Sequence, residues 1–171
     1  MDGIRQERYK WLKMKIINIK DYDICNFKEP SMFVIMPYCS FKCDKENNQQ
    51  LCQNCSLAKE PKIDISIDEL INLYDNDKPV EAIVFGGLEP FDSNEELQCF
   101  IMNFRYQHDN TIVIYTGYTE EEVKEKFNWI YLYENIIIKY GRYRPNQKPH
   151  YDEILGVNLV SDNQYAKAYN M

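Results

Sequence analysis

The sequence predicts an α/β fold, a partial, open parallel (β/α) barrel. Short runs rich in β-branched residues alternate with segments of amphipathic helical spacing, which is typical of parallel strands joined by right-handed crossovers. With 171 residues the chain is long enough for one core. It offers five or six strands, too few for a closed eight-stranded barrel of ~250 residues. We expect a single domain over residues 14–171, preceded by a basic amphipathic extension at 1–13.

Each predicted element has its own signal. The strongest strand candidates are residues 32–36, 81–85, 111–115 and 135–139, and weaker ones are 15–19 and 156–160. Capping boxes predict three helix starts, at Ser66 with Glu69, Ser93 with Glu96, and Thr119 with Glu122. One buried face is expected in each helix, formed by Ile67, Leu70, Ile71 and Tyr74, by Leu97, Phe100, Ile101 and Phe104, and by Val123 and Phe127.

Composition and charge exclude several classes of function. A net charge of −7 argues against a nucleic-acid partner. No apolar run approaches the roughly 20 residues of a membrane span, and the first residues lack the apolar segment of a signal peptide. We therefore expect a cytoplasmic protein without a membrane partner, whose cysteines are metal ligands or packing residues rather than disulfides.

The remaining cysteines and histidines have ordinary interpretations. Cys25 and Cys99 are expected to be small buried hydrophobic residues, Cys99 within a helix. His108 and His150 lie in polar surroundings and are expected to be solvated.

The unusual residues of the sequence follow the predicted strands. A cysteine-rich loop follows residues 32–36, GGLEP follows 81–85, TGY follows 111–115 and YGRY follows 135–139. Since the carboxyl ends of parallel strands share one face, where ligands bind, these loops should converge there. Gly86, Gly87 and Gly117 would let the backbone approach a ligand closely.

Four cysteines form a cluster with the spacing C-x3-C-x8-C-x2-C, at Cys39, Cys43, Cys52 and Cys55. Four thiolates could close a tetrahedral zinc site, and the spacing alone favours zinc. Soft thiolates suit an iron–sulfur cluster equally well. A zinc ribbon, however, has no need of a buried strand ending in two glycines and the carboxylate of Glu89.

The ordered combination of these motifs resembles the radical S-adenosylmethionine enzymes. Three cysteines in a C-x3-C-x2-C loop after the first strand hold a 4Fe-4S cluster in that family, and a GGE segment after the second strand binds S-adenosylmethionine. The matching segments here are CSFKC and GGLEP. Small size, YTGY after the third strand and VSDNQ at 160–164 resemble, within the family, activating proteins of anaerobic ribonucleoside-triphosphate reductase.

The resemblance implies a partial barrel of the radical S-adenosylmethionine type with two cofactors. Cys39, Cys43 and Cys52 would hold the 4Fe-4S cluster, and Cys55 is a rival for the third position. Cys52 is preferred as the third ligand because the segment CQN is similar to the C-x-N segment that commonly follows the first two cysteines in the activators. S-adenosylmethionine would bind at Gly86, Gly87, Glu89, Thr116 and Gly117.

The function implied is activation of a glycyl-radical enzyme. The partners would be the large catalytic subunit of anaerobic ribonucleotide reductase and a low-potential electron donor. Two alternatives stay open: the same chemistry on another protein or a small substrate, and a non-catalytic zinc-binding interaction module that uses all four clustered cysteines.

Overall fold

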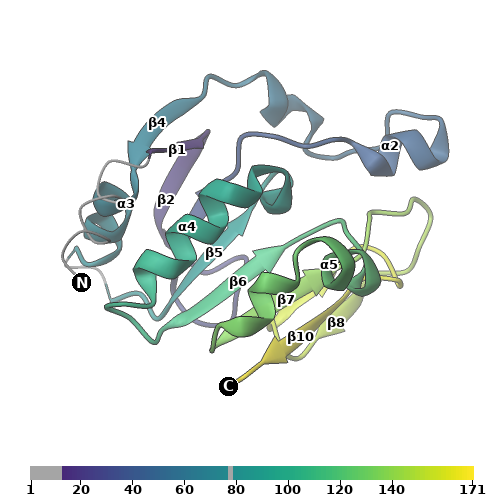
Figure 1. The fold of residues 1–171 in the computed structure, drawn as a ribbon. Helices are drawn as coiled ribbons and strands as arrows, with labels where there is room; N and C mark the ends of the chain where they lie inside the picture. The colour runs from purple at the N-terminus through teal and green to yellow at the C-terminus, as the bar shows by residue number, and fades with distance from the viewer. Residues whose placement is uncertain (1–12, 77–78) are drawn as a thin grey trace.

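A computed structural model describes residues 13–76 and 79–171 and confirms the α/β class. Figure 1 shows the ribbon. The strands are β1 (Lys13–Ile16), β2 (Asn18–Asp23), β3 (Ser31–Ile35), β4 (Ile63–Ser66), β5 (Ala82–Gly86), β6 (Thr111–Tyr115), β7 (Ile136–Tyr140), β8 (His150–Asp152), β9 (Val157–Leu159) and β10 (Tyr165–Tyr169). The helices are α2 (Lys42–Asn47), α3 (Ile67–Tyr74), α4 (Asn94–Phe104) and α5 (Glu120–Lys126), with 3-10 helices η1 (Cys55–Lys59), η2 (Pro90–Ser93) and η3 (Asn128–Leu132).

The main sheet is open and six-stranded, in the order β10-β7-β6-β5-β3-β2. Its four central strands, β3, β5, β6 and β7, are mutually parallel, as the alternation of strands and helices predicts. Both edges differ from an all-parallel sheet, because β2 joins β3 as an antiparallel hairpin and β10 returns antiparallel to β7. The described residues form no closed barrel.

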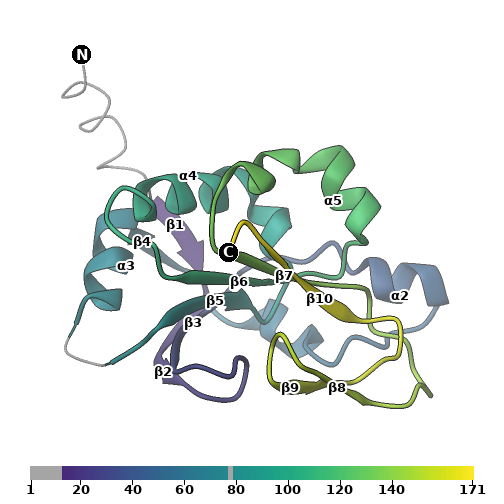
Figure 2. The ribbon, with the colours of Figure 1, turned by 90° about the horizontal axis from the view of Figure 1, so that it is seen from below.

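The two faces of the sheet bury different cores. Because side chains alternate along a strand, Val34, Phe85 and Ile114 pack on one face with α3, α4 and α5. Phe33 and Val113 point to the other face, where the β8–β9 hairpin covers them through Leu155 and Leu159. Figure 2 shows the three helices on one side of the sheet and the hairpin on the other. The hairpin leaves this second face uncovered near the carboxyl ends of the parallel strands.

Two of the three predicted capping boxes are confirmed. Ser66 and Thr119 each accept a hydrogen bond from the backbone of the glutamate three residues later, and both reciprocal bonds are present. The box at Ser93 is wrong: this residue makes no side-chain capping bond, because the chain enters α4 directly from η2. All three predicted apolar helix faces are buried or packed against the core.

Several smaller predictions need correction. Residues 15–19 are not one strand, because the chain changes partners at Ile17, from β4 to β3. Cys25 is exposed rather than buried, because the Asp23 carboxylate accepts from its backbone N–H (3.2 Å) and turns the chain at the end of β2. Cys99 lies in α4 as predicted and is partly buried. His108 is not simply solvated: its ring stacks on Phe104 at 4.5 Å.

One prediction concerns residues that the structure does not describe. Residues 1–12 of the predicted extension are not among the described residues, and Lys13 already belongs to β1.

None of the helices in residues 13–76 and 79–171 combines the length and apolar character that a membrane crossing requires.

Candidate functional site

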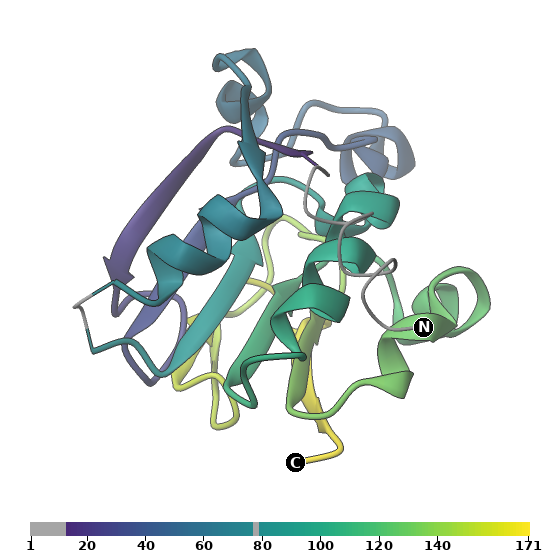
Figure 3. The same cartoon turned by 60° about the vertical axis from the view of Figure 1, so that its left-hand side comes forward.

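A cavity of about 580 Å³ opens at the carboxyl ends of the parallel strands. Its volume lies in the range of small-molecule and cofactor sites. Figure 3 shows the loop with α2 and η1, in blue, at the end of the molecule opposite the C-terminus. The cavity is lined by most of the predicted site residues, namely Cys39, Cys43, Cys52, Gly87, Glu89, Thr116 and Gly117. Two predicted residues, Gly86 and Cys55, do not line it.

The two adjacent glycines have different structural roles. Gly86 is the last residue of β5, and a Cβ there would lie 3.1 Å from the Phe33 ring and 3.3 Å from Tyr115 Cβ. It permits close packing of the strands beneath the cavity. Gly87 has φ +81°, and a Cβ would lie 2.7 Å from Ile35 Cγ2. The left-handed turn that directs GGLEP into the cavity therefore requires glycine at position 87.

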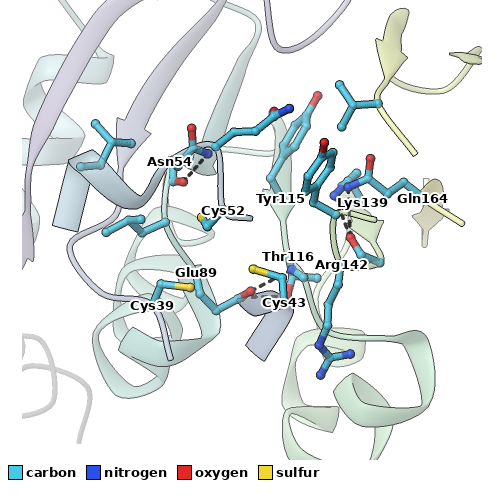
Figure 4. A pocket seen from close by; sticks show the side chains of 18 of the residues that line it. Cys39, Cys43, Cys52, Asn54, Glu89, Tyr115, Thr116, Lys139, Arg142 and Gln164 are labelled. Carbon is cyan, nitrogen blue, oxygen red and sulfur yellow. Dashed lines mark hydrogen bonds between the residues drawn. The ribbon is translucent and has the colours of Figure 1, made fainter. Parts of the chain in front are cut away.

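Glu89 joins the loops that follow β5 and β6. It is buried, and its backbone N–H donates to the Tyr38 carbonyl (2.8 Å) in the cysteine loop. Its Oε1 accepts from the Thr116 hydroxyl (2.7 Å), and its Oε2 accepts from the Gly117 N–H (2.8 Å). Figure 4 shows Glu89 and Thr116 in contact at the cavity wall. Glu89 thus connects three loops of the site, through its backbone N–H and its carboxylate.

Burial also changes the acidity of Glu89. Loss of solvent raises the pKa of its carboxyl to about 7, although the hydrogen bonds from Thr116, Gly117 and Phe91 favour the ionised form. Near neutral pH this group therefore exists in both protonation states. It can accept a hydrogen bond from a ligand, or donate one when protonated.

The cysteine loop is organised by local hydrogen bonds. Asp44 Oδ1 accepts from the backbone N–H of Leu51 and of Cys52, each at 2.8 Å, which closes the eight-residue segment between Cys43 and Cys52 into a compact loop. At the other end, the Phe41 N–H donates to Cys39 Sγ at 3.3 Å, with Phe41 in a left-handed conformation (φ 51°). These bonds hold Cys39, Cys43 and Cys52 at one cavity.

The cysteine loop also contacts the GGLEP segment that follows β5. The Asn54 side chain donates to the Gly87 carbonyl at 2.8 Å. Asn54 is the last residue of the CQN segment, so the asparagine of that motif links the two loops. Asp92 of η2 makes a second connection, because it accepts from the Ser40 N–H and from the Tyr118 hydroxyl.

The three thiols fit a metal cluster by their chemistry. Burial raises the pKa of Cys39 to about 12 and of Cys43 to about 11, and it raises the pKa of Cys52. Cys43 and Cys52 are close enough to share a hydrogen bond. No three His, Cys, Asp or Glu side chains of the described residues are already arranged as a metal site. The donor set is therefore present as partly buried, protonated thiols that a metal would have to deprotonate.

Cys55 differs from these three cysteines. It begins η1, lies outside the cavity lining, and its sulfur accepts a hydrogen bond from the Gln50 amide at 3.3 Å. The cavity thus brings together three of the four clustered thiols, with Cys52 rather than Cys55 beside Cys39 and Cys43.

Sequence reasoning missed the charged residues that position α2. Arg142, after β7, hydrogen-bonds Glu122 of α5 (2.7 Å) and lies 3.2 Å from Glu46 of α2. The ammonium of Lys42 sits 4.1 Å from the centre of the Tyr118 ring. Arg142 and Lys139 belong to KYGRYRPNQK, at 139–148, whose first half is largely buried. Only tertiary structure reveals this, because the local composition is that of an exposed turn.

The segment SDNQ shapes the loop after β7. The Ser161 hydroxyl accepts from Arg144 N–H (2.9 Å), and the Asn163 amide donates to the Arg142 carbonyl (2.9 Å). The Gln164 amide donates to the Gly141 carbonyl at 3.2 Å, and Gln164 lines the cavity. The motif near the C-terminus is thus part of the same site as the cysteines.

Comparison with known proteins gives one match. A family model described as a 4Fe-4S single cluster domain matches residues 31–164, which is well over half of the chain. The matched segment contains the cysteine loop, GGLEP, TGY and SDNQ. No curated protein and no solved structure matches the chain. The match supports an iron–sulfur cofactor.

Proposed function

Because the chain belongs to the 4Fe-4S single cluster domain family, we propose that it is a radical S-adenosylmethionine enzyme that activates anaerobic ribonucleotide reductase. One observation carries the proposal. The ends of β3, β5 and β6 deliver three thiols, a buried carboxylate and the TGY backbone to one cavity of about 580 Å³. Three thiolates leave one iron of a 4Fe-4S cluster without a protein ligand, and a cofactor can bind there.

Each part of the site has a role in the proposal. Cys39, Cys43 and Cys52 hold the cluster, and Asp44 keeps their loop closed. When bound and reduced, the cluster would supply the electron for reductive cleavage of S-adenosylmethionine, the chemistry by which a hydrogen atom would be removed from a glycine Cα of the reductase. Glu89 would orient the loops that hold the cofactor. Gly117 exposes backbone at the cavity wall.

The partners follow from this chemistry. The substrate is the large catalytic subunit of anaerobic ribonucleotide reductase, which presents the glycine at the cavity mouth. A low-potential donor supplies the electron. The proposal also places the enzyme in the cytoplasm.

The first experiment tests the cofactor chemistry. The protein is reconstituted anaerobically, its iron and sulfide are measured, and dithionite is added with S-adenosylmethionine. About four irons per chain and formation of 5′-deoxyadenosine are expected. One zinc per chain, with no iron and no cleavage, would refute the proposal. A glycyl radical signal after addition of the reductase would then identify the target.

The two alternatives have less support. A four-cysteine zinc module needs Cys55 beside the other three thiols, but Cys55 lies outside the cavity lining and the family match is to a 4Fe-4S domain. The same radical chemistry on another protein or a small substrate remains consistent with the cavity. 5′-Deoxyadenosine formation without a glycyl radical on the reductase would favour that alternative.

A further inference from the structure

Asp92 is a partly buried carboxylate beside the cysteine loop, and the mechanism above does not use it. It lies in η2, outside the cavity lining. Its Oδ2 accepts from the Ser40 N–H, and its Oδ1 accepts from the Tyr118 hydroxyl at 2.8 Å. None of the ion pairs among residues 13–76 and 79–171 includes Asp92. Its negative charge is therefore not neutralised by a neighbouring cation.

The hydrogen bond to Asp92 decides where one backbone N–H group next to Cys39 points. The Phe41 N–H donates to Cys39 Sγ at 3.3 Å, whereas the Ser40 N–H donates to Asp92. Hydrogen bonds to the sulfur atoms stabilise the reduced, more negative form of an iron–sulfur cluster, and so they raise its reduction potential. By accepting from Ser40, Asp92 directs one such donor away from the sulfur of Cys39.

The charge of Asp92 also reaches Cys39. Only a hydrogen bond and a peptide bond separate the Asp92 carboxylate from this residue. Burial is the main reason why the pKa of the Cys39 thiol rises to about 12, and the charges of Glu89 and Asp92 add to that rise. The same field would disfavour an added electron on a cluster bound there, because like charges repel. Both effects of Asp92 therefore act to lower the reduction potential.

Tyr118 opposes part of this charge. Its hydroxyl is the one side-chain donor to Asp92 in the described part of the chain, and the residue is only 7 % exposed. The ammonium of Lys42 lies 4.1 Å from the centre of the Tyr118 ring, but it pairs with Glu122 at 3.7 Å and not with Asp92. The hydrogen bond from Tyr118 thus spreads the negative charge of the carboxylate without cancelling it.

We propose that Asp92 is a positioning residue that holds the reduction potential of the iron–sulfur cluster low. It acts through Cys39, by the direction of the Ser40 N–H and by its own charge. A more negative potential makes the reduced cluster a stronger electron donor, which the cleavage of a sulfonium requires. The inference rests on the proposed function only for the presence of a cluster bound by Cys39.

The test is a redox titration of the anaerobically reconstituted full-length protein, followed by EPR, without S-adenosylmethionine. Asp92→Asn removes the charge but keeps the size of the side chain. It should shift the reduction equilibrium about tenfold toward the reduced form, a rise of roughly 59 mV for a one-electron couple. Asp152→Asn is the matched control, because Asp152 is also partly buried and accepts from two backbone N–H groups, but in the β8–β9 hairpin. Asp152→Asn should leave the potential unchanged.

Tyr118→Phe separates the charge from a purely structural role. It keeps the ring and Asp92 but removes the hydroxyl that donates to the carboxylate, so the potential should fall. A purely structural role predicts the same direction in Asp92→Asn and Tyr118→Phe, because each loses a contact that holds the loops together. Shifts in the same direction, or no shift in Asp92→Asn, overturn the proposal. If Asp92→Asn assembles no cluster, a fall in Tyr118→Phe supports the proposal, and any other result overturns it.

Separate readouts keep this inference apart from the proposed function. The formation of 5′-deoxyadenosine tests the function, and the reduction potential tests Asp92. Cleavage by the wild type, together with an unchanged potential in Asp92→Asn, keeps the function and overturns the inference. Opposite shifts in the two variants without any cleavage keep the inference and refute the function. A wild-type chain that assembles no iron–sulfur cluster refutes both.

Discussion

Replacement of Glu89 by glutamine tests how this carboxylate fixes the site. The carboxylate accepts from Thr116, Gly117 and Phe91. Both oxygens of the carboxyl can accept hydrogen bonds even when the group is protonated, whereas an amide has only one oxygen, so at least one of these donors would face an NH₂ group instead. A buried donor without an acceptor costs about 1–3 kcal/mol. At about pH 5, Glu89→Gln should therefore be less stable than wild type by roughly this amount.

The pH dependence follows from the pKa of Glu89. Burial raises it from 4.5 to about 7. A carboxyl whose folded pKa lies above its unfolded value stabilises the fold fully below the unfolded pKa, and this contribution is lost as the pH rises through the folded pKa. The difference between the two pKa values corresponds to about 3 kcal/mol in total, of which about 2 kcal/mol is lost between pH 5 and pH 8.

Urea unfolding of the metal-free variants at a series of pH values measures this effect. The stability difference between wild type and Glu89→Gln should shrink by about 2 kcal/mol from pH 5 to pH 8, because the amide does not titrate. Glu122→Gln is the control. Burial alone would raise the pKa of Glu122, but hydrogen bonds from Arg142 and Thr119 outweigh it and lower the pKa to about 2, so its contribution stays almost constant over this range. Parallel curves for wild type and Glu89→Gln would refute the reasoning.

Three further outcomes are expected. Cys55→Ser should keep the iron content and visible absorption of the reconstituted protein while Cys52→Ser loses both; loss in both variants would return Cys55 to the ligand set. Gly87→Ala should lower the free energy of unfolding by about 1–3 kcal/mol because of its positive φ, whereas Gly117→Ala, whose Cβ would meet only atoms at 3.6 Å, should change it by less than about 0.5 kcal/mol in the same urea assay. Asp44→Ala should leave two loop N–H groups unpaired and speed cluster loss in a chelator challenge, and wild-type retention would contradict its role.

The sequence was informative wherever a local pattern has one physical solution. The four apolar runs form the parallel strands because they are buried on both faces and cannot be exposed. Ser66 and Thr119 start helices because a side-chain oxygen and a glutamate satisfy free backbone N–H groups within four residues. Strands β8 and β10 had no such signal, since their short polar segments become strands only through their partners.

The site also combines features that the sequence predicts with features that only the structure shows. That the loops after β3, β5 and β6 meet was predictable, because parallel strands share a direction and the motif residues stand at their ends. Which of Cys52 and Cys55 faces the cavity was not predictable, because the segment after Cys43 folds through Asp44 and Asn54 contacts that no spacing rule describes.

The sequence by itself determined the class of fold, the end of the sheet that carries the site and the thiol chemistry available there, because periodicity and residue type are local properties. Only the tertiary structure decided the antiparallel edges, the contacts made by Glu89 and the burial of Lys139 in the cavity wall. These depend on which distant residues come within a few ångströms and on how much solvent remains. Such contacts are set by packing of the whole chain.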